Sequence, residues 1–218
     1  DLVRKKIAVE KRRPDGRAAD EIRAILARAW NSGVRMVDTA PVYGDIEAHI
    51  DRLADDYEFA IVSKIPALPP ALAADGVATF VGESIRETRS RLGQRLSAIL
   101  FHRSDDLLGD RANEAWQAAM MATADAGVQL GVSCYSPSDA AAVRARFPIT
   151  AAQIPGNAFD QRLASTTGLG DLVIWLRSVF LQGLLLLTPE QVAVRMPAAA
   201  AAATAWSAWC RDHGLPPL

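Results

Sequence analysis

The feature that most constrains the fold is a strand-and-helix unit that recurs along the chain. Short β-rich runs bounded by turn residues alternate with segments whose apolar residues recur at helical spacing. This alternation predicts parallel strands joined by right-handed crossovers. The expected strands are 34–40, 59–64, 97–102, 128–133, 150–154 and 172–178, and the expected helices are 18–30, 47–53, 76–92, 113–126, 138–146 and 197–212.

The pattern is compatible with two α/β architectures, an open doubly wound sheet and a closed barrel. Several strands are apolar on successive residues, which is typical of a sheet covered on both faces. No GxGxxG follows an early strand and no GxxxxGK[ST] loop occurs, so an open dinucleotide-binding sheet loses its best support. The 218 residues are fewer than the about 250 typical of a (β/α)8 barrel. We treat 1–218 as one domain, with 5–9 as a candidate additional strand.

Composition excludes several classes of function. The net charge is -1, which argues against a nucleic-acid partner. No run of about 18 apolar residues occurs and the first residues lack the apolar core of a signal peptide, so we expect neither a membrane span nor secretion. Cys134 and Cys210 lack metal-ligand spacing and are expected to be reduced, in a cytoplasmic protein.

A polar or ionisable residue stands at the carboxyl end of every expected strand. The carboxyl ends of parallel barrel strands meet at one rim, where the chemistry of such folds gathers. Taken singly, these residues have ordinary interpretations as a helix cap, a solvated charge or a structural histidine, and only the whole set together indicates chemistry. The residues are Asp38, Lys64, His102, Ser133 with Cys134, Gln153, and Arg177 with Ser178.

Asp38, Tyr43, Lys64 and His102 can together carry out the acid–base part of carbonyl reduction. That reaction needs a hydride donor and a proton for the developing alkoxide. The phenol of Tyr43 could donate the proton, with the Lys64 ammonium lowering a pKa that is otherwise near about 10. Asp38 would pair with Lys64, and His102 could donate a hydrogen bond to the carbonyl oxygen. The hydride must come from a cofactor because no side chain supplies one.

These residues resemble the aldo-keto reductases. The run from Gly33 to Gly44, GVRMVDTAPVYG, is similar to that family's GxxxxDTAxxYG signature, and weaker matches follow in order to about residue 187. The resemblance implies a (β/α)8 barrel, Tyr43 as the general acid, and NADPH, with NADH as the alternative, extended across the carboxyl-end face. It also implies that a small-molecule carbonyl is the substrate. The implied cofactor-binding residues are Ser133, Cys134, Gln153, Arg177, Ser178, Phe180, Leu181, Gln182 and Gly183.

The sequence departs from the family pattern in four places. Cys134 stands where the family often has Asn, and Arg177 stands where an aromatic residue often stacks on nicotinamide. No Gly-rich first strand precedes residue 20. We also find no counterpart of the family's last strand among the 218 residues. We therefore expect a barrel that is incomplete at both ends, and we leave the oligomeric state open.

Two other functions compete with reduction. The departures motivate a non-catalytic binding or regulatory subunit on the same scaffold. A metal-dependent barrel isomerase is weaker because no His/Asp/Glu cluster recurs at the strand ends, so we expect no metal. Asp105 and Asp106 are expected in a solvated loop, and His49 and His213 on the surface.

Overall fold

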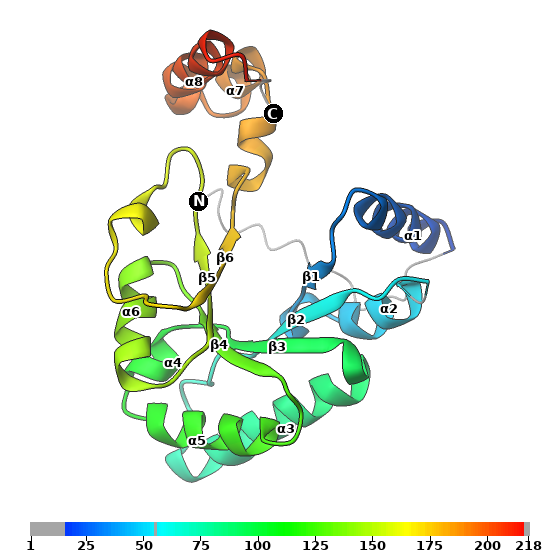
Figure 1. Cartoon of the computed structure of the whole chain (residues 1–218), viewed down its shortest axis with the longest axis vertical. Coiled ribbons are helices and arrows are strands. Elements are labelled where there is room, and N and C mark those ends of the chain that lie inside the picture. The colour runs from blue at the N-terminus through cyan, green and yellow to red at the C-terminus, as the bar shows by residue number, and fades with distance from the viewer. Residues whose placement is uncertain (1–15, 55, 216–218) are drawn as a thin grey trace.

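The computed structural model describes residues 16–54 and 56–215 of the chain. Six strands form one parallel sheet in chain order, and the sheet curls into part of a barrel (Figure 1). Every predicted strand is present, shifted by no more than two residues at either end. The strands are β1 (Met36–Asp38), β2 (Ala60–Ile65), β3 (Leu96–Phe101), β4 (Gln129–Ser133), β5 (Ala151–Pro155) and β6 (Val173–Arg177).

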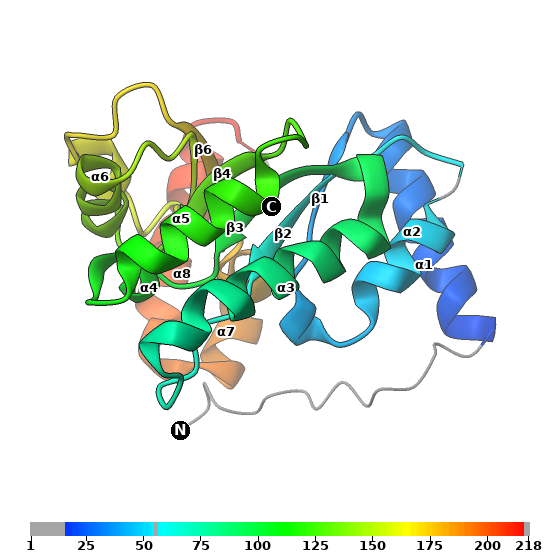
Figure 2. The ribbon, with the colours of Figure 1, turned by 90° about the horizontal axis from the view of Figure 1, so that it is seen from below.

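Helices follow the strands and cover the convex side of the sheet. α3 and α5 lie side by side across it, as the view from below shows (Figure 2). α7 and α8 pack on each other beyond the carboxyl end of β6 (Figure 1). The α-helices are α1 (Gly16–Asn31), α2 (Ile46–Leu53), α3 (Ala74–Leu92), α4 (Asp105–Leu108), α5 (Ala112–Thr123), α6 (Pro137–Arg146), α7 (Pro189–Arg195) and α8 (Ala200–Asp212). The 3-10 turns are η2 (Pro41–Tyr43), η3 (Gly93–Arg95), η4 (Arg162–Ser165), η5 (Leu181–Leu186) and η6 (Pro197–Ala199).

The main core lies between the sheet and the helices on its convex side. α3 contributes a buried stripe at helical spacing that includes Val77, Val81 and Ile85, and these side chains pack in one cluster with Ile99 and Phe101 of β3. A second, smaller cluster fills the concave side of the sheet with Val62, Ala98, Leu100 and Ala151, with Trp175 against it. A (β/α) barrel has the same arrangement, with helices around the outside of the sheet and packed side chains inside it.

The barrel is open. Within the described residues β1 pairs only with β2, and β6 pairs only with β5. Both edge strands are more exposed than the four between them, since Met36 is 38% exposed and Leu176 is 51% exposed. The expected fold class, a (β/α)8-type barrel that is incomplete within the described residues, is confirmed, and the candidate strand at 5–9 lies outside those residues.

The structure corrects two smaller expectations and adds one helix. Asp106 is not part of a solvated loop: it lies in α4, is 9% exposed, and accepts a hydrogen bond from the backbone of Leu68 at 3.3 Å. His49 is half-buried and its Nε2 is covered, while His213 is exposed as expected. α7 was not predicted, although Thr188 and Gln191 form a capping box at its start.

Candidate active site

The period-two alternation of the strands brings the predicted residues to one rim. Side chains two apart on a strand share a face of the sheet. Lys64, His102 and Gln153 each stand two residues after a member of the concave-side cluster, namely Val62, Leu100 and Ala151. The rim above that cluster therefore receives one polar side chain from each strand: Asp38, Lys64, His102, Ser133, Gln153 and Arg177.

Lys64 and Asp38 form an ion pair at this rim. The Lys64 side chain is 2% exposed, and its Nζ donates to Asp38 Oδ1 at 2.6 Å and to the backbone oxygen of Thr39 at 2.9 Å. The Asp38 side chain keeps 44% of its surface exposed. A buried ammonium needs such partners because it has lost its water. The predicted pairing of Asp38 with Lys64 is therefore present.

A hydrogen-bonded chain continues from Asp38 across the concave side. Gln153 Nε2 donates to Asp38 Oδ1 at 2.9 Å, and Ser133 Oγ donates to Gln153 Oε1 at 3.1 Å. Both Ser133 and Gln153 are buried. The chain of bonds joins the ends of β1, β5 and β4, so three strands far apart in sequence hold one polar network.

His102 lies at the same rim, half-buried, with a lowered pKa. Burial is the largest cause and the Lys64 charge the second, while Asp38 acts in the opposite direction. Both leading causes disfavour the imidazolium. His102 is therefore neutral at pH 7 and can donate one ring N–H without carrying a charge.

Acidification should expose the lowered pKa of His102. Because the folded state binds this proton less readily than the unfolded chain, stability is lost as the pH falls from about 6.5 through the folded pKa. We expect His102→Gln to lose less unfolding free energy between pH 7.5 and pH 5.5 than the wild type. Urea unfolding at the two pH values measures this. An NMR titration that placed the His102 pKa above about 6.5 would contradict the assignment.

Tyr43 reaches the rim from η2, directly after β1. Its side chain is 47% exposed, and its pKa is raised, first by burial and then by the Asp38 charge, while Arg177 acts to lower it. The expectation that Lys64 lowers this pKa is not met. The reason is that Asp38 neutralises Lys64 at 2.6 Å and itself raises the phenol's pKa. Tyr43 is thus a protonated phenol at neutral pH.

Arg177 and Cys134 meet beside this group. The Arg177 guanidinium donates from Nη2 to the Cys134 backbone oxygen at 2.9 Å and lies 4.5 Å from the ring centre of Tyr135. The Cys134 thiol is fully buried, and burial raises its pKa to about 12. Cys134 therefore offers its backbone, not its thiol, to the site. Both Cys134 and Cys210 are free thiols, as expected.

The segment after β6 has an unusual backbone. Ser178, Leu181 and Gln182 have φ values of 57°, 47° and 55°, in the left-handed region that favours glycine, and Gly183 follows with φ 89°. Such conformations in non-glycine residues concentrate at ligand-binding segments. Phe180, between them, is 45% exposed. The predicted cofactor segment 178–183 thus follows directly from the rim residue Arg177.

A buried network on the helix-covered side of β2 was missed by sequence reasoning. Glu47 is 1% exposed; it accepts a hydrogen bond from Ser63 Oγ and an ion pair from Arg91 at 3.1 Å. Glu47 lies in the first turn of α2, just after the Tyr43 turn, and Ser63 precedes Lys64, so the network ties the two segments together. The sequence signal for this network was weak: Glu47 stands at the start of a helix, close to apolar residues that face the core.

Removing the Glu47 carboxylate should cost stability. Glu47→Ala would leave the buried Ser63 hydroxyl without its acceptor and would break the ion pair of Glu47 with Arg91, and we expect a loss of about 2–4 kcal/mol in unfolding free energy. Glu87→Ala is the matched control because the Arg91–Glu87 pair is exposed and should be worth at most about 0.5 kcal/mol. Equal losses in urea unfolding of the two variants would contradict the role given to Glu47.

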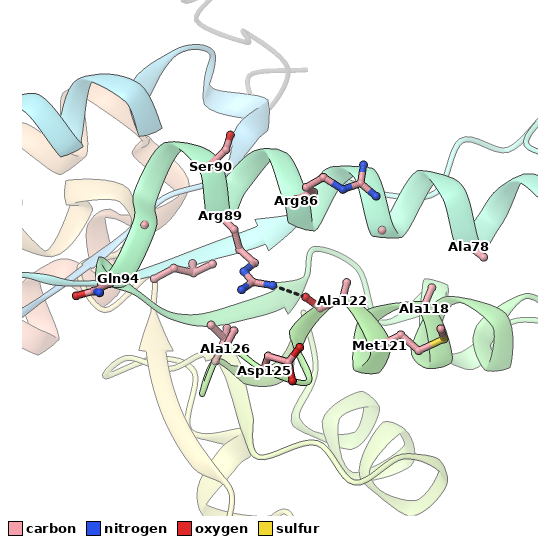
Figure 3. A pocket seen from close by; sticks show the side chains of 14 residues that line it. Ala78, Arg86, Arg89, Ser90, Gln94, Ala118, Met121, Ala122, Asp125 and Ala126 are labelled. Atoms are coloured by element: carbon pink, nitrogen blue, oxygen red, sulfur yellow. Dashed lines mark hydrogen bonds between the residues drawn. The ribbon is translucent and has the colours of Figure 1, made fainter.

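Three further observations concern metal binding, the convex side of the sheet and membrane spans. Among residues 16–54 and 56–215, no group of three or more His, Cys, Asp or Glu residues is placed to hold a metal ion. A groove of about 880 Å³ lies between α3 and α5, where Arg89 donates to the Ala122 oxygen at 2.8 Å (Figure 3). This groove is on the convex side of the sheet, away from the rim. In the described part of the chain no helix has the length and apolarity to cross a membrane.

Comparison with known proteins identifies the class of the protein. The model of the aldo/keto reductase family matches residues 11–217, so the chain belongs to this family of NAD(P)H-dependent oxidoreductases. No curated protein sequence matches the chain significantly. The resemblance found in the sequence is therefore confirmed.

Solved structures agree with the fold. PA4992 from Pseudomonas aeruginosa, assigned to the aldo-keto reductases, is 20% identical, with a TM-score of 0.61 over 76% of this chain and 68% of its own. The holo form of aldo-keto reductase AKR11C1 from Bacillus halodurans is 16% identical, with a TM-score of 0.64 over 77% and 60%. A single-residue mutant of Gox0644 in complex with NADPH is 20% identical, with a TM-score of 0.57 over 81% and 66%. The chain thus spans about 60–68% of the length of these relatives.

Proposed function

We propose that the protein reduces an aldehyde or ketone to an alcohol with NADPH, and that Tyr43 is the general acid. The observation that supports this proposal is the Lys64–Asp38 pair at 2.6 Å, with His102 and Tyr43 both near enough to Asp38 for its charge to act on their pKa values. Family membership supports the reaction class, and the relative Gox0644 is described in complex with NADPH.

The residues of the rim fit a nicotinamide cofactor. The buried hydroxyl of Ser133 and amide of Gln153 supply the kinds of donor and acceptor that a carboxamide needs. The left-handed backbone of Ser178, Leu181 and Gln182 fits a segment that follows the phosphates. When bound, NADPH supplies the hydride; NADH remains the alternative.

The chain's own residues would manage the proton and the carbonyl oxygen. Tyr43, held protonated by burial and by Asp38, donates its proton to the oxygen of the reduced carbonyl. Neutral His102 donates a ring N–H to the same oxygen and fixes the carbonyl's orientation. The Lys64–Asp38 pair keeps the rim rigid and limits the charge near the phenol. The overall reaction converts carbonyl, NADPH and one proton into alcohol and NADP⁺.

Two measurements on the purified full-length protein test this proposal. NADPH should bind with quenching of intrinsic tryptophan fluorescence, and a panel of aldehydes should then oxidise NADPH, followed at 340 nm. Absence of NADPH binding would overturn the proposal. Binding without turnover would favour a cofactor-dependent regulatory subunit, for which the buried Cys134 in place of an amide is the motivating observation.

A further inference from the structure

The guanidinium of Arg177 is a cation without a counter-ion at the rim. Within the part of the chain that the structure describes, no carboxylate lies within ion-pair distance of it, and its covered Nε has no hydrogen-bond partner. By contrast, the other rim cation, Lys64, is paired with Asp38 at 2.6 Å. A half-buried charge that lacks a partner is costly unless a ligand provides one.

The Arg177 charge acts on the residues that would carry out the reaction. It opposes the raised pKa of Tyr43 and contributes to the lowered pKa of His102. Since Lys64 and Asp38 cancel and both Tyr43 and His102 are neutral at pH 7, the rim retains one net positive charge. That charge acts on both groups proposed to engage the carbonyl, so it lies within reach of a substituent of a bound substrate.

Two contacts hold the guanidinium plane in place. The Cys134 backbone oxygen accepts from Nη2 at 2.9 Å, and the Tyr135 ring stacks 4.5 Å from the central carbon. Besides the ring contact with Tyr135 and the hydrogen bond from Nη2, the guanidinium has another nitrogen, Nη1, with no protein acceptor among the described residues. A planar, fixed guanidinium of this kind recognises carboxylates in two-point geometry.

We infer that the substrate carries a carboxylate, which Arg177 binds while Tyr43 and His102 engage the carbonyl. This inference rests on the proposed reductase function and names the substrate class of that site: oxo acids and aldehyde acids. Neutral carbonyl compounds of the same size would leave the cation unpaired and should be poorer substrates. Arg177 is thus a specificity-determining residue, in addition to any contact with the cofactor.

The test compares each carboxylate with its neutral amide. Pyruvate is paired with pyruvamide and 4-formylbenzoate with 4-formylbenzamide, which vary the distance from carbonyl to carboxylate. For at least one pair we expect the wild-type kcat/KM for the acid to exceed that for the amide by at least tenfold. Arg177→Gln should reduce this ratio to near one. Arg86→Gln, a change on the exposed face of α3, should leave it unchanged (Figure 3).

Any of the following results would overturn the inference. It fails if the wild type prefers the amides, if the ratio survives Arg177→Gln, or if the loss in Arg177→Gln falls on the Kd of NADPH alone, which would assign the guanidinium to the cofactor. If no carbonyl compound is reduced, calorimetric binding of 4-(hydroxymethyl)benzoate and its amide decides without turnover. A preference for the acid that Arg177→Gln removes then supports the anion site while the reductase proposal fails, and no preference overturns the inference.

Discussion

Tyr43→Phe is expected to lower the rate of carbonyl reduction by about 10²–10⁴-fold while NADPH still binds. The change removes only the phenolic oxygen, so the ring remains on the turn after β1 and the backbone of η2 is undisturbed. A general acid contributes about this much to a rate because the alkoxide must otherwise take its proton from water. Single-turnover oxidation of NADPH at 340 nm measures the loss, and fluorescence titration measures cofactor affinity.

The raised pKa of Tyr43 adds a pH dependence to this prediction. The phenol must be protonated to donate, and burial with the Asp38 charge holds its pKa above 10.0. The rate of reduction in the wild type should therefore not fall between pH 7 and pH 9 through ionisation of Tyr43. Tyr57→Phe is the matched control because Tyr57 packs with Trp30 and Phe59, away from the rim. If Tyr43→Phe reduced carbonyls as fast as Tyr57→Phe, another group would have to be the acid.

The same variant separates the two functions that the scaffold allows. A regulatory subunit would use the rim to bind the cofactor and would not depend on the phenolic proton. Its partner function would then be unchanged in Tyr43→Phe, whereas a reductase loses turnover. The distinction needs no knowledge of the natural substrate.

The fold was predictable because its signals are local. Each strand is a short, largely apolar run with a polar residue within two positions of its carboxyl end, and glycines such as Gly33 and Gly93 stop the preceding helices with φ values of 89° and 53°. The rim was predictable for the same reason: parallel strands in chain order bring their ends together. Knowing that Lys64 ends one strand and Asp38 another was sufficient to expect their contact.

The electrostatics were not predictable in the same way. The direction of the Tyr43 pKa depends on which charge remains after Lys64 and Asp38 have paired, and that is a matter of distances. The buried Glu47 network likewise depends on Ser63 and Arg91, which lie 16 and 44 residues away. Sequence spacing gives no information on such contacts. The direction of a pKa shift can therefore be inferred only after the fold has given the distances between the charged groups.

Gly131→Ala is expected to be the most damaging single-methyl change in the sheet. Gly131 lies in β4, opposite Leu100 of β3 and Ala151 of β5. An added Cβ would lie 2.1 Å from the Ala151 backbone oxygen and 2.8 Å from Leu100 Cδ2. Backbone cannot move aside as a flexible side chain can, so β4 and β5 must separate. Overpacking of a rigid site costs about 1–3 kcal/mol and at times more, and we expect the upper part of that range.

The loss should extend from stability to cofactor binding. Ser133 and Gln153 lie two residues beyond Gly131 and Ala151, and their 3.1 Å hydrogen bond depends on the same strand pairing. Gly82→Ala is the matched control: Gly82 lies within α3, an added Cβ there meets nothing within 4 Å, and the change should stabilise the helix by about 0.5–1 kcal/mol. Urea unfolding and NADPH titration of both variants measure the two effects. A Gly131→Ala protein as stable as the wild type would mean that β4 and β5 can part without cost, and the rigid rim on which the proposed chemistry depends would not exist.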